Sequence, residues 1–144
     1  MADVTELRVA LTVPDFDRAL SFYRDALGLE QLADWSSESG RVILLAAGRA
    51  TLELLDEAQA EAVDAIEAGR RVSGRVRLAL EVVDSEAAAR RLVAAGGEQV
   101  APLVTTPWGD RNARVQTPDG TQLTLFTPDR CSRRGCSRGR GTIS

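Results

Sequence analysis

The first part of the chain alternates between apolar and polar residues. Residues 6–13, with the sequence ELRVALTV, place every second side chain on the same face, which predicts a half-buried strand. Pro14 ends this strand, and Asp15 can cap a helix that finishes at Gly28, where a left-handed C-cap is expected. The apolar stripe of this helix consists of Phe16, Leu20, Tyr23 and Leu27. Further strands are predicted at 29–35, 41–47 and 50–55.

The same order of elements returns in the second part. Residues 57–69 form a short connecting helix or a linker, 75–82 form a strand, and Asp84 opens a helix that runs to about Ala95. Three more strands are predicted near 98–104, 111–116 and 121–126. A spacing of 69 residues relates Arg8 to Arg77, Val13 to Val82, Asp15 to Asp84, Gly28 to Gly97 and Gly40 to Gly109. We interpret this spacing as a duplicated βαβββ unit.

These patterns predict an α+β fold. Two tandem βαβββ modules form a curled mixed sheet around a cavity. Residues 1–127 form a single domain, with module one at 5–56, a linker at 57–74 and module two at 75–127. Residues 128–144 are rich in Arg, Gly and Ser without apolar periodicity, so we expect a disordered tail.

Strand alternation also assigns residues to the two faces of the sheet. Helices should cover the faces that carry Leu and Val. The opposite face then carries Arg8, Ala10, Thr12, Thr51, Glu53, Leu55, Arg77, Ala79, Glu81, Asn112, Arg114, Gln116, Gln122, Thr124 and Phe126. This face is either exposed to solvent or, as the small residues Ala10 and Ala79 favour, a concave surface with room for a ligand.

Composition narrows the chemistry. The chain contains no histidine, and all 18 of its basic residues are arginine, which excludes Schiff-base lysines, imidazole bases and His-rich metal sites. Residues 1–127 carry 13 arginines against 20 acidic residues, so nucleic acid is not an expected partner. No apolar run is long enough to cross a membrane. The only cysteines, Cys131 and Cys136, make no disulfide framework or zinc site, and we expect a cytoplasmic protein.

Four segments carry a resemblance to a known family. They are VALTVPDFDRALSFYRDALGLE, the LELL around Glu53, RLALEVVDSEAAARRLVAAGG and the closing TPDGTQLTLF. Together they resemble the vicinal oxygen chelate superfamily of glyoxalases, extradiol dioxygenases and bleomycin-resistance proteins, over about residues 5–127. The resemblance implies paired βαβββ modules that curl around a cavity, often in a homodimer.

The resemblance also locates four strand positions that hold a divalent metal in the metalloenzymes of this superfamily. They fall at Arg8, Glu53, Arg77 and Thr124. Only Glu53 keeps a usual ligand type, because arginine repels a cation and cannot coordinate it. One carboxylate and one hydroxyl are too few for a hard divalent metal, although Glu81 could add a second carboxylate. We therefore expect no cofactor and favour a protein that is not an enzyme, with Glu53 paired to Arg8, Arg77 or both.

Other residues extend the predicted site. Trp35 and Trp108 border loops, and they either pack in the core or stack on a flat ligand, as aromatics near such positions do in the bleomycin-resistance branch. Arg8, Arg77 and Arg114 could receive a carboxylate or phenolate. The predicted binding residues are Arg8, Trp35, Glu53, Arg77, Trp108, Arg114 and Thr124.

Three functions fit these observations. The first is a metal-independent protein that binds a small organic molecule, such as an aromatic antibiotic or natural product, and sequesters it. The second is a metal-dependent lyase, isomerase or dioxygenase of the same superfamily with an altered metal site. The third is a protein whose pocket is vestigial and which serves only in dimer assembly.

Overall fold

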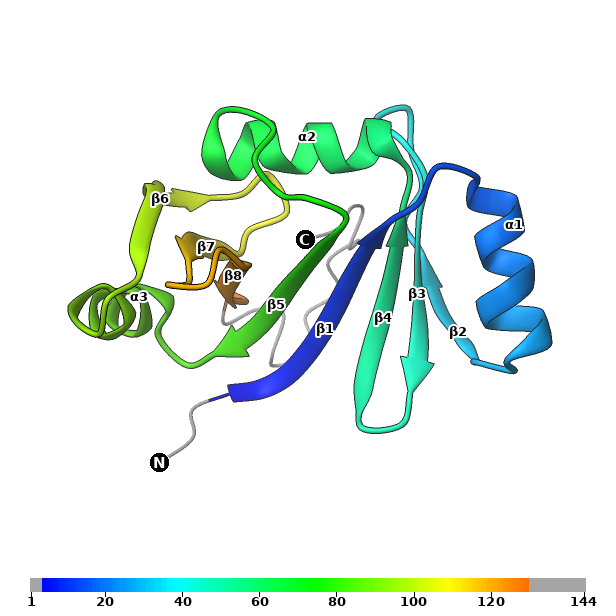
Figure 1. The fold of residues 1–144 in the computed structure, drawn as a ribbon, viewed down its shortest axis with the longest axis horizontal. Helices are drawn as coiled ribbons and strands as arrows, with labels where there is room; N and C mark the ends of the chain where they lie inside the picture. Colours follow the sequence, from blue (N-terminus) through cyan, green and yellow to red (C-terminus); the bar gives the residue numbers. More distant parts are fainter. Residues whose placement is uncertain (1–3, 130–144) are drawn as a thin grey trace.

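The computed structural model describes residues 4–129 and shows the order strand–helix–three strands twice (Figure 1). The first unit comprises β1 (Val4–Thr12), α1 (Phe16–Leu20), the π-helix η1 (Ser21–Ala26), β2 (Gln31–Asp34), β3 (Val42–Ala47) and β4 (Ala50–Leu55). After α2 (Glu57–Ala68), the second unit comprises β5 (Val76–Val82), α3 (Ser85–Ala94), β6 (Glu98–Thr105), β7 (Arg111–Gln116) and β8 (Gln122–Thr127). The predicted tail, with Cys131 and Cys136, lies outside the described residues from position 130 on, and the domain boundaries stay a prediction.

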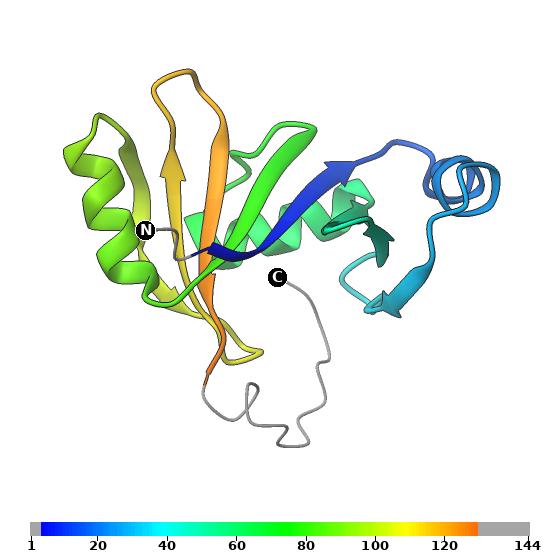
Figure 2. The same ribbon diagram turned by 90° about the horizontal axis from the view of Figure 1, so that it is seen from below.

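All eight strands belong to one mixed sheet, in the order β2-β3-β4-β1-β5-β8-β7-β6. The two units meet at its centre, where β1 pairs antiparallel with β5. On either side of this pair, β1 runs parallel to β4 and β5 runs parallel to β8. Figure 2 shows the sheet curling between α1 and α3, which lie at opposite ends of the molecule. The predicted α+β class with a curled mixed sheet is confirmed.

The helices α1 and α3 cover the apolar face of the sheet, one in each unit. Phe16 and Leu20 of α1 pack on Ile43, Leu45 and Leu54, and the equivalent cluster under α3 consists of Val82, Ala88, Ala89, Ala113, Val115 and Leu125. The two helices begin in the same way. Asp15 accepts a hydrogen bond from the Arg18 N–H at 3.1 Å, and Asp84 accepts one from the Ala87 N–H at 3.1 Å.

The helix predicted from Asp15 to Gly28 forms, but its apolar stripe does not continue to Leu27. After Leu20 the chain changes to a π-helix, in which the Leu27 N–H bonds to the Phe22 carbonyl five residues earlier. The wider turn rotates the following residues, so Leu27 is 61% exposed rather than buried. Gly28 then ends the helix with a φ of +88°, as predicted.

The segment predicted as a short helix or linker at 57–69 is the longest helix of residues 4–129, α2. Asp56 caps its start by accepting from the Gln59 N–H at 2.8 Å, and Gly69 ends it with a φ of +81°. Figure 1 shows α2 lying apart from α1 and α3, along one edge of the view. No helix among residues 4–129 has the length and apolar character needed to span a membrane.

Candidate functional site

The strand register brings the four matched positions together on the polar face at the centre of the sheet. Arg8 of β1 stands opposite Ala79 of β5, which stands opposite Thr124 of β8. In the neighbouring row, Ala10 separates Glu53 of β4 from Arg77 of β5. The small alanines leave room for the longer side chains between them. All four residues are buried, as is Arg114 in the next strand, β7.

Glu53 is completely buried and lies next to a guanidinium. Its Oε1 is 3.7 Å from Nη2 of Arg77, which confirms the predicted pairing with that arginine. Among the described residues, none donates a hydrogen bond to either carboxylate oxygen of Glu53. Burial raises the pKa of Glu53 to about 7, although the positive charges of Arg77 and Arg8 oppose this rise. Glu53 is thus a carboxyl group that can change its charge near neutral pH.

Arg8 forms an ion pair with an acidic residue of its own strand. Its Nε donates to Oε2 of Glu6 at 2.7 Å, while its guanidinium carbon lies 5.4 Å from the centre of the Trp35 ring and 4.9 Å from that of Phe126. Burial disfavours its charge, but the hydrogen bond to Glu6 and the charge of Glu53 outweigh this and raise the pKa of Arg8. Arg8 therefore neutralises Glu53 only at longer range.

Arg114 is the centre of a buried ion-pair network in module two. Its guanidinium donates to Glu67 Oε1 from Nε at 3.0 Å and from Nη2 at 2.8 Å. Nη2 is also 2.9 Å from Oδ1 of Asp64, and Nη1 donates to the Ser73 hydroxyl at 3.0 Å. Two carboxylates of α2 thus surround one guanidinium of β7, which satisfies a charge that burial would otherwise penalise heavily.

Thr124 connects this network to Arg77. Its Oγ1 accepts from Arg77 Nη1 at 2.8 Å and from Arg114 Nε at 2.9 Å, and it lies 3.2 Å from Glu67 Oε1, to which it can donate. At the position that matches a metal ligand, the hydroxyl therefore joins two arginines to a carboxylate. Burial lowers the pKa of Arg77 against the attraction of Glu67 and Glu53.

The sequence analysis did not predict that side chains of α2 belong to this site. Asp64 and Glu67 lie on the buried side of α2 together with Gln59, Ala60, Val63 and Ala68. The sequence does contain an indication of this role. Two acidic residues share the helical stripe of Ala60 and Val63, where an amphipathic surface helix would carry apolar residues. Their partners, Asn112 and Arg114, lie 45 and 47 residues from Glu67 along the chain.

The helix α2 packs over part of the polar face of the sheet. The space enclosed there between α2 and strands β1, β4 and β5 measures about 10 Å³, enough for one water molecule. It is lined by Ala10, Thr12, Leu55, Ala60, Asp64, Ser73 and Arg77. The sheet and α2 are thus closely packed at this place.

The two tryptophans lie in different segments of the fold. Trp35 follows β2, is partly buried against Ala10, Val42 and Leu55, and contacts Arg8. Trp108 lies in the turn between β6 and β7, which Thr106 and Asp110 close by a backbone hydrogen bond of 2.8 Å. Trp35 is therefore placed beside the charged polar face, whereas Trp108 belongs to a turn outside the strands.

The residues at the matched positions do not fit a divalent metal. Arg77 donates to Thr124 and pairs with Glu53, so a guanidinium stands where the metal would need a ligand. Within residues 4–129, no group of three or more Asp, Glu, His or Cys residues is arranged to hold a metal ion. The acidic side chains near Arg114 are already engaged by that arginine.

Comparisons with known proteins agree with this fold. A family model described as Glyoxalase/Bleomycin resistance protein/Dioxygenase superfamily matches residues 7–125. Methylmalonyl-CoA epimerase from Mycobacterium tuberculosis is 25% identical, with 94% of this chain and 95% of that chain covered and a TM-score of 0.64. A superfamily member from Vibrio splendidus is 18% identical, with 85% and 97% covered and a TM-score of 0.61.

A ligand complex is also among the similar structures. Streptomyces coelicolor methylmalonyl-CoA epimerase in complex with 2-nitronate-propionyl-CoA is 21% identical, with 87% of this chain and 98% of that chain covered and a TM-score of 0.61. No curated protein sequence matches the chain.

Proposed function

The chain belongs to the glyoxalase/bleomycin resistance protein/dioxygenase superfamily, and we propose that it binds a small organic molecule without a metal ion. One observation carries this proposal. Arg77 and Thr124, at two of the matched positions, are hydrogen-bonded to each other at 2.8 Å, and Arg77 pairs with Glu53 at a third. The positive charge that a metal would supply comes from guanidinium groups.

The polar face offers a ligand several ways to be recognised. Glu53 presents two oxygens that accept no hydrogen bond from residues 4–129, so a ligand that donates a proton or hydrogen bond would satisfy them. Arg8 of β1 and Arg77 of β5 supply positive charge to Glu53. Trp35, in contact with Arg8, provides an aromatic surface at the border of this face.

The biological role we propose is sequestration of an antibiotic or natural product, in a cytoplasmic homodimer. The superfamily includes bleomycin-resistance proteins, in which aromatic residues near such positions stack on flat ligands, and the place of Trp35 beside the polar face supports a similar role. A second chain would cover apolar side chains that one chain leaves exposed, among them Phe22 at 62% exposed and Leu32 at 50% exposed.

A second candidate function is catalysis, as a lyase, isomerase or dioxygenase of the same superfamily with an altered metal site. The burial and the raised pKa of Glu53 favour catalysis. A buried carboxyl group with a pKa of about 7 suits a general base that works near neutral pH. The structural likeness to methylmalonyl-CoA epimerase at 25% identity points in the same direction. Turnover of a bound ligand, abolished in Glu53→Gln, would distinguish this function from sequestration.

We expect ligand binding to quench tryptophan fluorescence in the absence of metal. The titration uses flat aromatic antibiotics and aromatic carboxylic acids in a buffer that contains EDTA. Because Trp35 borders the polar face, Trp35→Phe should remove most of the response, and Trp108→Phe measures the contribution of the second predicted binding tryptophan. Quenching that occurs only after a divalent metal is added would contradict metal-independent binding. A response from no ligand would contradict the binding function itself.

A further inference from the structure

Glu67 is held in the way that a binding site holds a carboxylate ligand. Its Oε1 accepts two hydrogen bonds from Arg114 and lies within reach of the Thr124 hydroxyl, and its Oε2 accepts from Asn112 Nδ2 at 2.7 Å. The three partners come from β7 and β8 and share the polar face of the sheet. Both carboxylate oxygens are thus bound by a guanidinium, an amide and a hydroxyl, which is a complete set of donors for one anion.

Asp64, one turn earlier on α2, shares Arg114 with Glu67, at 2.9 Å between Oδ1 and Nη2, but most of its hydrogen bonds have a structural role. It accepts from the backbone N–H groups of Val72 and Ser73, both at 2.8 Å, from the Ser73 hydroxyl at 2.7 Å and from Arg71 at 3.0 Å. These donors belong to the segment that follows α2. Burial opposes its charge, but Ser73 and Arg114 stabilise the ion and lower the pKa of Asp64 to about 2. Asp64 therefore fixes the path of the chain.

Glu67 makes no such contact with the segment that follows α2. Its hydrogen bonds go only to side chains of β7 and β8, which are 45 to 57 residues away along the chain. Its removal would leave the donors of Asn112, Arg114 and Thr124 in place around a space of carboxylate size. The backbone of the segment after α2 would stay fixed by Asp64.

We infer that Arg114, Asn112 and Thr124 form a carboxylate-binding site, and that Glu67 occupies it as an internal substitute for the ligand. This inference rests on the proposed function and names the chemistry of its ligand: an organic carboxylate whose remaining body lies along the polar face. Such a ligand exchanges with Glu67, and α2 then moves away from the sheet. The movement opens the enclosed space of about 10 Å³ next to Arg77.

The exchange also sets a requirement on the ligand. A carboxylate that is attached to the protein competes at an effective concentration in the millimolar range or higher, so a small free anion does not displace Glu67 from the intact chain. A ligand that also contacts Arg8, Glu53 or Trp35 gains the additional binding energy that it needs. The site consequently selects a carboxylic acid with a sizeable organic body over simple anions.

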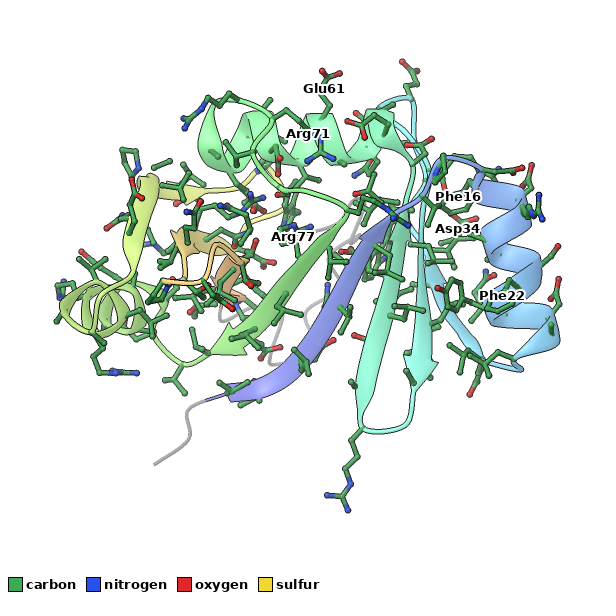
Figure 3. All side chains as sticks on the ribbon, viewed as in Figure 1. Phe16, Phe22, Asp34, Glu61, Arg71 and Arg77 are labelled. Atoms are coloured by element: carbon green, nitrogen blue, oxygen red, sulfur yellow. The ribbon has the colours of Figure 1, made fainter. Side chains whose placement is uncertain are left out.

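Removal of the internal carboxylate tests this site directly. In Glu67→Ala, sodium formate or acetate should raise the melting temperature relative to sodium chloride of equal ionic strength. The rise should be roughly 3–8 °C when the anion exceeds its Kd about tenfold. Figure 3 shows Glu61 on the outer side of α2, pointing away from the sheet. Glu61→Ala is therefore the matched control, and neither it nor the unchanged protein should respond.

A second variant covers the case in which Glu67→Ala does not fold. Glu67→Ser leaves space for formate and keeps one hydroxyl for the donors of the site, and it should show the same rise or regain its fold in formate. If neither variant responds more to formate than Glu61→Ala, the inference is wrong. The tryptophan titration of the unchanged protein is independent of this result. If ligands quench Trp35 but formate does not stabilise the Glu67 variants, the carboxylate site is wrong and the binding function stands. If formate stabilises these variants but no ligand quenches Trp35, the binding function is wrong and the carboxylate site stands.

Discussion

Replacement of Arg114 by alanine should lower the free energy of unfolding by about 3–5 kcal/mol. The side chain is fully buried, and its loss would leave the carboxylates of Asp64 and Glu67 in the interior without their cation. The network therefore stabilises the fold mainly because removal of one partner leaves the charge of the other buried and unpaired. Urea denaturation near pH 7 measures the change.

The control for this substitution is an arginine in an exposed ion pair. Arg90 of α3 lies 3.5 Å from Glu86 one helical turn earlier, and both side chains are more than half exposed, at 69% and 56%. Arg90→Ala should change the free energy of unfolding by about 0.5 kcal/mol or less. A loss below about 1 kcal/mol for Arg114→Ala would mean that α2 and β7 are not joined by this network in solution.

Glu53 should make the protein less stable as the pH rises toward neutrality. Its pKa is about 7 in the folded chain against 4.5 for an ordinary glutamate, so between these values the folded state binds more protons than the unfolded state. The contribution of Glu53 is therefore fully present below pH 4.5 and is lost as the pH rises through about 7. At one pKa unit per about 1.4 kcal/mol, the loss approaches roughly 3 kcal/mol.

The variant Glu53→Gln isolates this effect, because glutamine has similar volume and does not ionise. Its free energy of unfolding relative to the unchanged protein should rise by roughly 3 kcal/mol between acidic and mildly alkaline pH. Glu61→Gln, on the exposed side of α2, is the control and should follow the unchanged protein within about 0.5 kcal/mol. If the difference in free energy of unfolding between Glu53→Gln and the unchanged protein does not depend on pH, Glu53 is ionised over the whole pH range. A strong ion pair with Arg77 would have this effect.

The sheet and its faces could be predicted because they depend on local sequence. Alternation of apolar and polar residues fixes which side chains of a strand share a face, and so it placed Arg8, Glu53, Arg77 and Thr124 together. The caps of α1 and α3 were equally local, since Asp15 and Asp84 bond to N–H groups three residues ahead.

The contacts of α2 could not be predicted in the same way. The acidic residues on its buried side are acceptable only because Arg114 and Asn112 meet them from a strand more than forty residues away. Without that knowledge, EAQAEAVDAIEA resembles a solvent-exposed connector. The same limit applies to Arg8, which forms an ion pair with Glu6 and feels the charge of Glu53 at longer range, because the choice between two acids depends on side-chain packing.

The π-helical turn after Leu20 is a third feature that could not be predicted from the sequence. The sequence of this segment fits an ordinary helix with Leu27 on the apolar stripe. The structure instead buries Phe16 and Leu20, packs Tyr23 partly against the same cluster and leaves Leu27 exposed. A single wide turn changes which side chains reach the core, and a periodicity of 3.6 residues cannot reveal it.

Metal-independent binding is the central claim, and elemental analysis tests it most directly. The protein is purified without chelator and without a metal-binding tag, and its content of Zn, Mn, Fe and Ni is measured beside that of Glu53→Ala. Because guanidinium groups supply the positive charge at the matched positions, both proteins should contain only traces of metal that do not differ between them. One divalent metal per chain, lost in Glu53→Ala, would contradict the account.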